Sequence, residues 1–170
     1  KDGKTICLYT NNVDAQHMYV SKATDKNYDV LVLDSPIVAH LIQKLETKLD
    51  KVSFVRVDSD SIDNLIKKDE KLESILSEED QKKLKKSIEK ILPGEGFSVS
   101  FDALSPSSPP IVITQSEFMR RMKEMSMTGG GPMMGMGNMP DSYNLIVNSN
   151  HKLISKINSM KGKPKTSLKE

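Results

Sequence analysis

The chain has 170 residues, of which 25 are basic and 23 acidic, so its formal net charge at pH 7 is +2. This near-neutral balance argues against a nucleic-acid binder that works mainly by phosphate neutralisation, because such proteins concentrate basic residues. A single cysteine, Cys7, excludes an internal disulfide framework and a multi-cysteine zinc site. No run approaches the ~18 apolar residues that a membrane span needs.

The chain begins at Lys1 without a methionine, a signal sequence or a transit pattern. We therefore expect an excised piece of a longer, cytoplasmic protein. Methionine is its unusual component, because eight of the 10 Met lie between Met119 and Met139.

The first 68 residues alternate strand and helix patterns. Strands are expected at 4–9, 30–33 and 52–57, and the continuous apolar run at 30–33 predicts a strand covered on both faces. A first helix is expected at 13–24. A second helix is expected to begin at the Asp34-Ser35-Pro36 start signal, and a third around 62–66, capped by the aspartates at 58–60. This order predicts a small parallel sheet in an α/β/α unit.

Residues 69–93 are rich in Lys and Glu, and we expect them to form a charged helical connection. The helix within it is expected to begin at the capping Ser77. Residues 94–170 then predict a small α+β unit. Its expected strands are 97–101, 111–113 and 143–147, and its helices run from a Thr114–Glu117 capping box to about 127 and over 150–160. The Gly- and Met-rich loop 128–142 is expected to lack regular structure. The fold class is therefore α/β, with α+β character overall.

Motifs for catalysis and for cofactors are missing. No Gly-x-x-x-x-Gly-Lys-Ser/Thr sequence is present, so nucleotide binding by this chain is not expected. Asp58, Asp60 and Asp63 do not have the spacing of a calcium loop, and helix capping explains them better. The three histidines do not form a metal motif. The sequence thus predicts no catalytic residue, no bound cofactor and no metal site.

The helix that follows Thr114 carries an apolar stripe. Phe118, Met122 and Met125 share one face at i, i+4 and i+7, with Met119 at its edge. Charged residues (Arg120, Arg121, Lys123 and Glu124) are expected on the opposite face. Such a stripe is usually core, but methionine is also typical of adaptable binding surfaces, so both interpretations stay open here.

Three segments resemble the heat-shock protein 90 family of molecular chaperones, in its bacterial form. Residues 108–122 (SPPIVITQSEFMRRM) are similar to the start of the family's C-terminal domain, and 148–154 (NSNHKLI) to a segment that follows its loop. Residues 28–42 (YDVLVLDSPIVAHLI) resemble the last α/β/α part of the family's middle domain. The resemblance runs in order over residues 4–158. It implies that 1–68 end the middle domain and 94–170 are part of the C-terminal domain.

The resemblance implies an ATP-dependent chaperone that binds unfolded or partly folded client proteins. The implied client-binding residues are Phe118, Met119, Met122, Met125, Met127, Ala39, His40 and Gln43. Ala39, His40 and Gln43 match a client-contact patch in which relatives often have Trp where this chain has His40.

The chain also departs from the family pattern. The N-terminal domain that binds ATP and Mg²⁺ is not part of this sequence, so the fragment itself is not expected to be an enzyme. The terminal helices that dimerise the full-length protein are not recognisable after Ile157, so a monomer or a weakly associated fragment is expected. Nucleic acid and membranes are not expected partners. The alternative interpretation is a docking or dimerisation module whose methionine stripe is buried in the full-length assembly.

Overall fold

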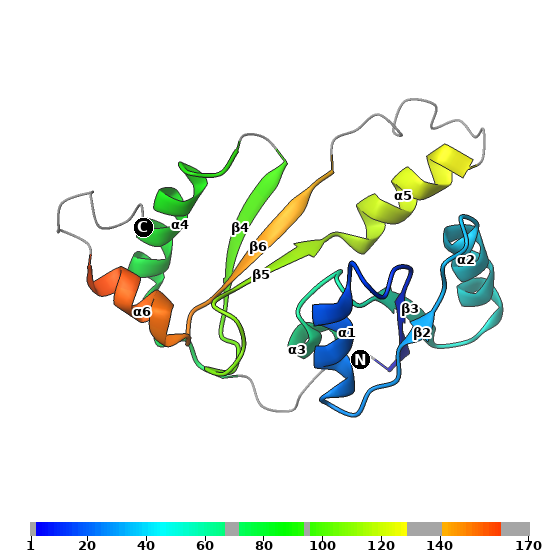
Figure 1. Ribbon diagram of the computed structural model, residues 1–170, viewed down its shortest axis with the longest axis horizontal. Coiled ribbons are helices and arrows are strands. Elements are labelled where there is room, and N and C mark those ends of the chain that lie inside the picture. Colours follow the sequence, from blue (N-terminus) through cyan, green and yellow to red (C-terminus); the bar gives the residue numbers. More distant parts are fainter. Residues whose placement is uncertain (1–2, 67–71, 94–95, 129–140, 161–170) are drawn as a thin grey trace. The chain divides into compact units, whose positions relative to one another are not determined.

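A computed structural model describes residues 3–66, 72–93, 96–128 and 141–160 (Figure 1). The chain divides into two compact units. Unit 1 comprises Lys1–Asp69 and Ile113–Asn144, and unit 2 comprises Glu70–Val112 and Leu145–Glu170. Among the described residues, every helix is too short or too polar to cross a bilayer.

Unit 1 is built on three parallel strands, which confirms the predicted parallel α/β arrangement. The strands are β1 (Thr5–Thr10), β2 (Leu31–Val32) and β3 (Val52–Arg56), in the order β2-β1-β3. Alternate side chains of β1 enter two separate cores, as the two-residue period of a strand requires. Leu8 packs with α1 (His17–Thr24) and α3 (Ile62–Leu65), whereas Tyr9 packs with α2 (Val38–Lys48).

Three local predictions for unit 1 are wrong. The strand at 30–33 is reduced to two residues, and Leu31 and Val32 are 47% and 58% exposed because β2 is an outer strand. Helix α2 begins at Val38, later than the predicted start at Pro36, and the Ser35 hydroxyl accepts from the amide of Ile37 at 3.5 Å in the turn before the helix. Asp58 does not cap α3, because its carboxylate is bound by Arg56.

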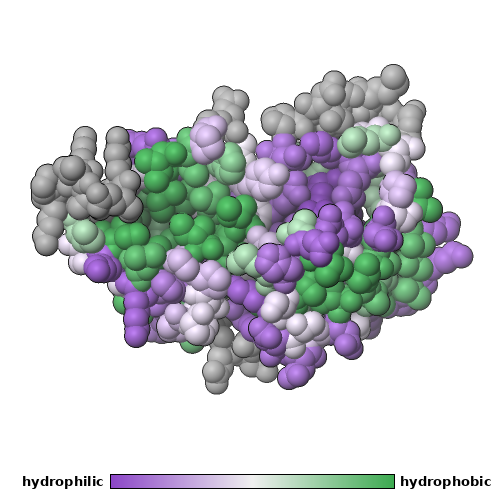
Figure 2. All heavy atoms as spheres, viewed as in Figure 1, coloured by the Kyte–Doolittle hydropathy of each residue, from purple (hydrophilic) through white to green (hydrophobic). Residues whose placement is uncertain are grey.

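Unit 2 packs two helices on a three-stranded sheet. The strands are β4 (Phe97–Asp102), β5 (Ile111–Gln115) and β6 (Tyr143–Asn148), in the order β4-β6-β5, and β5 and β6 run across the division between the units. Helices α4 (Glu78–Glu89) and α6 (Lys152–Ser159) supply Leu84 and Ile154 to its core. Figure 2 shows hydrophobic residues gathered over α4 and β4 on the viewed face.

The two helix caps predicted for α4 and for the helix after Thr114 have different outcomes. The Ser77 hydroxyl accepts a hydrogen bond from the amide of Asp80, which confirms the predicted start of α4. The Thr114–Glu117 capping box is wrong, because Thr114 is buried within β5 and donates to the carbonyl of Asn144.

The two units also divide the chain at other points than the domain boundaries expected at 68 and 93, which stay predictions. The charged segment 69–93 contributes Leu76 and Leu84 to the core of unit 2. The helix α5 (Glu117–Thr128) belongs to unit 1. The loop predicted over 128–142 falls mostly outside the described residues.

Candidate functional site

Helix α5 docks on the rest of unit 1 through its charged face. Arg120 is only 5% exposed, and its guanidinium contacts the hydroxyl of Tyr9, a fully buried residue of β1. Arg120, Arg121 and Glu124 were predicted on the face opposite the apolar stripe, and in the structure this face contacts unit 1, with Arg120 buried and the other two partly buried. The charged residues of α5 therefore contact the rest of unit 1, and its apolar residues lie at the side of this contact.

Glu117 is the centre of this contact. Its Oε1 atom accepts hydrogen bonds from the Tyr9 hydroxyl at 3.1 Å, from Arg120 at 2.7 Å and from Arg121 at 2.7 Å. Its Oε2 atom accepts from the backbone amide of Arg56 at 3.3 Å. One carboxylate thus connects α5 to β1 and to β3.

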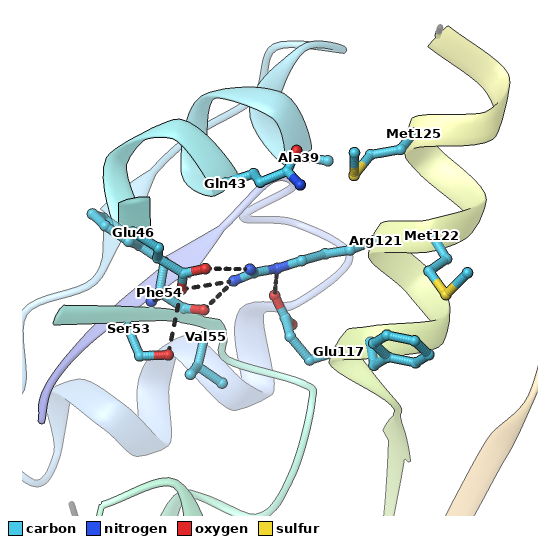
Figure 3. A pocket seen from close by; sticks show the side chains of 11 residues that line it. Ala39, Gln43, Glu46, Ser53, Phe54, Val55, Glu117, Arg121, Met122 and Met125 are labelled. Atoms are coloured by element: carbon cyan, nitrogen blue, oxygen red, sulfur yellow. Dashed lines mark hydrogen bonds and ion pairs between the residues drawn. The ribbon is translucent and has the colours of Figure 1, made fainter. Parts of the chain in front are cut away.

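Arg121 extends the contact to α2 (Figure 3). Its Nη1 atom donates to Glu46 Oε2 at 2.8 Å, and its Nη2 atom donates to Glu46 Oε1 and to the carbonyl of Phe54. Glu46 in turn accepts a hydrogen bond from the backbone amide of Phe54 at 2.7 Å. The fork geometry of a guanidinium suits such a two-point contact with a carboxylate. Together, Glu46, Glu117, Arg120 and Arg121 are called the α5 clamp below.

A second arginine supports the clamp from β3. Arg56 binds both carboxylate oxygens of Asp58, at 2.6 and 2.8 Å, and donates to Gln115 at 3.0 Å. It also forms an ion pair with Glu124 of α5 at 3.7 Å. Buried charges of this kind persist in proteins only when each has partners, and here each arginine has at least one carboxylate.

The clamp shifts the ionisation of its members. Burial raises the pKa of Glu117, but the charges and hydrogen bonds of Arg120 and Arg121 outweigh it and hold this pKa below its ordinary value. The pKa of Glu46 is lowered by the same balance, with burial opposed by Arg121 and by the amide of Phe54. Burial, with the nearby Glu117 charge, raises the pKa of the Tyr9 hydroxyl to about 12. At neutral pH both carboxylates are ionised and Tyr9 is neutral.

A cleft of about 600 Å³ lies beside the clamp, within unit 1. Residues of α2, β3 and α5 line it, namely Ala39, Gln43, Glu46, Ser53, Phe54, Val55, Glu117, Phe118, Arg121, Met122 and Met125. Met125 points from α5 toward Ala39 and Gln43 of α2 (Figure 3). Figure 2 shows hydrophilic residues over α5 on the viewed face.

Five of the eight sequence-predicted client residues meet at this cleft. Ala39 is buried, Gln43 is exposed, and Phe118, Met122 and Met125 line the α5 side. Phe118 is 68% exposed, so the stripe is not core. The two residue groups, about 80 positions apart in sequence, therefore share one surface. Their predicted role in binding clients stays a prediction.

The other three predicted residues are not among those that line the cleft. His40 lies on α2, and its Nε2 atom is 2.9 Å from the hydroxyl of Thr128, so it links the two helices instead. Met119 is half-buried, and Met127 is strongly exposed near the end of α5.

The sequence analysis missed the clamp. The Glu117–Arg120 and Glu117–Arg121 pairs have i, i+3 and i, i+4 spacing and could have been noticed on a helix. Glu46 and Tyr9 gave no such signal, because their partners lie far away in the sequence.

The cleft offers apolar contact rather than a site for chemistry. Its ionisable groups are bound to one another, and its remaining walls are mainly methionine, phenylalanine, valine and alanine side chains, with Gln43 and Ser53 as polar members. Within the described ranges, no three His, Cys, Asp or Glu residues gather as metal ligands.

Comparison with known proteins finds curated relatives over almost the whole chain. The chain is 44% identical over 160 residues to the "Chaperone protein HtpG" of Porphyromonas gingivalis and 45% identical to that of Bacteroides thetaiotaomicron. The HtpG protein of Bacteroides fragilis is 42% identical over the same length. Each match covers 92% of this chain and only 23% of the relative, so the chain spans about a quarter of the proteins it matches. No family model matches the chain.

Proposed function

The chain belongs to the heat-shock protein 90 family of molecular chaperones, in the segment that it shares with the HtpG proteins, and from this premise we propose that it binds unfolded or partly folded client proteins at the cleft between α2 and α5. The observation that carries the proposal is the orientation of α5. This amphipathic helix buries Arg120, holds Glu117 and Arg121 in ion pairs, exposes Phe118 and places the half-buried Met122 and Met125 at the cleft, so it presents apolar side chains to a partner.

The composition of this surface suits clients of many shapes. Methionine side chains are flexible and polarizable, so Met122 and Met125 can adapt to different apolar groups. Covering Phe118, Met122 and Met125 is worth roughly 5–9 kcal/mol in total at about 1.5–3 kcal/mol per side chain. An association cost of about 4 kcal/mol or more reduces this gain to about 5 kcal/mol or less, which corresponds to an affinity of roughly millimolar or weaker. A client held this weakly can leave again.

The activity of the whole protein is part of the same proposal. ATP binding, ATP hydrolysis and homodimerisation are assigned to parts of the longer protein outside this chain. Closure of that protein around ATP would change how the cleft is presented to clients. This chain would contribute client contact without an enzymatic step or a cofactor of its own.

The test is a titration that follows the methionine methyl groups by nuclear magnetic resonance. The 170-residue chain is titrated with a permanently unfolded variant of a small model protein and, separately, with the folded form of that protein. The methyl signals of Met119, Met122, Met125 and Met127 are expected to shift with the unfolded form only. Met18 on α1 is 58% exposed and should not shift, so it serves as the internal control.

Other results would contradict client binding at this cleft. Equal shifts at Met18 would mean non-specific association, and no shift at Met122 and Met125 would remove the site. Shifts of these two signals that depend on the concentration of the chain alone would favour the alternative, a surface that docks on another copy.

A further inference from the structure

The α5 clamp closes the outer edge of the parallel sheet. β3 is an outer strand, and one side of it pairs with β1. On its other side, the amide of Phe54 donates to Glu46, the carbonyl of Phe54 accepts from Arg121, and the amide of Arg56 donates to Glu117. Charged side chains of α2 and α5 thus occupy the hydrogen-bonding groups that a further strand would use.

This arrangement is an unusual way to dock a helix. A helix normally buries its apolar stripe, because water is removed from apolar surface. Here the stripe of Phe118, Met122 and Met125 stays at the cleft, Arg120 is buried, and Glu117 and Arg121 are partly buried in ion pairs. The Nε atom of Arg120 even lacks a hydrogen-bond partner within the described structure. A buried charge network of this kind is weak evidence for stability, but it can select one arrangement among several.

A rotation of α5 about its own axis is the competing arrangement. At 100° per residue, Met125 and Phe118 lie roughly a quarter turn from Glu117 on the helix. Such a rotation would place the stripe against the edge of β3 and would release the clamp to water. The sequence of α5 permits both arrangements, so the partners outside the helix, Glu46 and the backbone of β3, decide between them.

We propose that Glu46 and Arg121 act as positioning residues that set the rotation of α5 and so keep the Phe118–Met122–Met125 stripe open to the cleft. Glu46 holds the guanidinium of Arg121 at two points from α2, and Arg121 also binds Glu117 and the carbonyl of Phe54. The effect of this rotation on client binding rests on the proposed function. The role of Glu46 and Arg121 in setting the rotation of α5 does not depend on it.

The experiment measures the reaction of individual methionines with hydrogen peroxide in the full 170-residue chain, read by peptide mass spectrometry. The variants are Glu46→Gln, Arg121→Gln and the double variant. Lys123→Gln is the matched control, because it removes one positive charge from the same helix, where Lys123 pairs with Asp141 at 2.7 Å. The oxidation rates of Met122 and Met125 are each divided by that of Met18 on α1.

Each single variant is expected to lower both ratios at least threefold, because the stripe moves against the sheet edge. The double variant should lower them no further, since one contact is lost in all three. Lys123→Gln should leave both ratios within experimental error. A merely structural role would instead raise oxidation and speed amide exchange along α5. The Glu46→Gln variant leaves the sequence of α5 intact and so guards against a helix that fails to form.

Two results would overturn the inference. Unchanged ratios in Glu46→Gln and Arg121→Gln would show that other contacts set the rotation of α5. Faster oxidation together with faster amide exchange over 117–128 would show that the clamp holds α5 in place without setting its rotation. The oxidation ratios of Met122 and Met125 could be lowered in the variants although the unmodified chain does not bind unfolded proteins. That outcome would support the inference and contradict the proposed function.

Discussion

Helices α4 and α5 are both twelve residues long and amphipathic, yet they pack in opposite ways. α4 buries Leu84 in the core of unit 2 and exposes its ion pairs, Lys82–Glu78 and Lys83–Glu79. α5 buries its Glu117–Arg120 pair and leaves Phe118 exposed. Ion pairs at i, i+4 spacing are therefore solvated on α4, whereas on α5 the Glu117–Arg121 pair with this spacing is part of the docking face.

The difference shows what an amphipathic pattern does not specify. The period of apolar residues predicts that a helix has two faces, and the usual assumption is that the apolar face is buried. On α5 the buried face is decided by charged partners from elsewhere in unit 1. Exposed ion pairs like those on α4 are worth only about 0–1 kcal/mol, whereas removing one partner of a buried pair costs about 3–5 kcal/mol.

Arg120→Ala should have the largest effect on α5 and leave α4 unchanged. The substitution leaves Glu117 buried with fewer partners, and loss of one member of a buried pair costs about 3–5 kcal/mol. Amide hydrogen exchange should become faster over α5 and β1 and stay unchanged over α4. Equal exchange over α5 in both proteins would mean that its charged face contributes little to docking.

Leu84→Ala is the corresponding test in unit 2. Truncating a buried leucine leaves a cavity and costs about 2–5 kcal/mol. Leu84 is 3% exposed within the core cluster that also contains Val99 and Ile154. Exchange should rise over α4 and β4, while the methyl signals of Met122 and Met125 stay in place. A large change at those methyl groups would show that the two helices do not act separately.

Low pH should destabilise α5 more than α4, as Arg120→Ala does. The effect should be smaller than that of the substitution, because protonated carboxyl groups still accept some hydrogen bonds. The pKa values of Glu117 and Glu46 are lowered from the ordinary 4.5 in the folded chain. Their contribution to stability is therefore complete above the unfolded pKa and is lost as pH falls through the folded pKa. Between pH 6 and 3, the protection of the α5 amides, corrected for the slower intrinsic exchange at low pH, should fall more than the protection of the α4 amides. The Glu46→Gln variant should reduce this difference.

The sequence alone predicted the features that depend on neighbouring residues. The small parallel sheet of unit 1 followed from alternating strand and helix patterns, and the start of α4 followed from Ser77 and the acidic residues behind it. Features that depend on distant partners were missed. Leu31 and Val32 are apolar but lie on an outer strand, and Asp58 binds Arg56 instead of capping α3.

Five of the eight residues predicted to contact clients line the cleft, and their role in binding stays a prediction, but the construction of the cleft was not predicted. Phe118, Met122 and Met125 were correctly grouped on one face, and the cleft brings Ala39 and Gln43 to them. That the opposing charges form the docking face could not be read from α5 itself. Their partner Glu46 is 75 positions from Arg121, and pairing at such separation leaves no local pattern.

Phe118→Ser should have the smallest effect on stability and a clear effect on binding. Phe118 is 68% exposed, and substitutions at exposed positions usually change the free energy of unfolding by no more than about 0.5 kcal/mol. Loss of its apolar surface should weaken binding of an unfolded protein about tenfold or more, because a covered Phe contributes about 1.5–3 kcal/mol and about 1.4 kcal/mol equals a factor of ten. Ile91→Ser is the matched control beyond the end of α4, where Ile91 is 80% exposed. If both substitutions weaken binding equally, exposed apolar surface in general attracts the client, and the orientation of α5 has no special part in it.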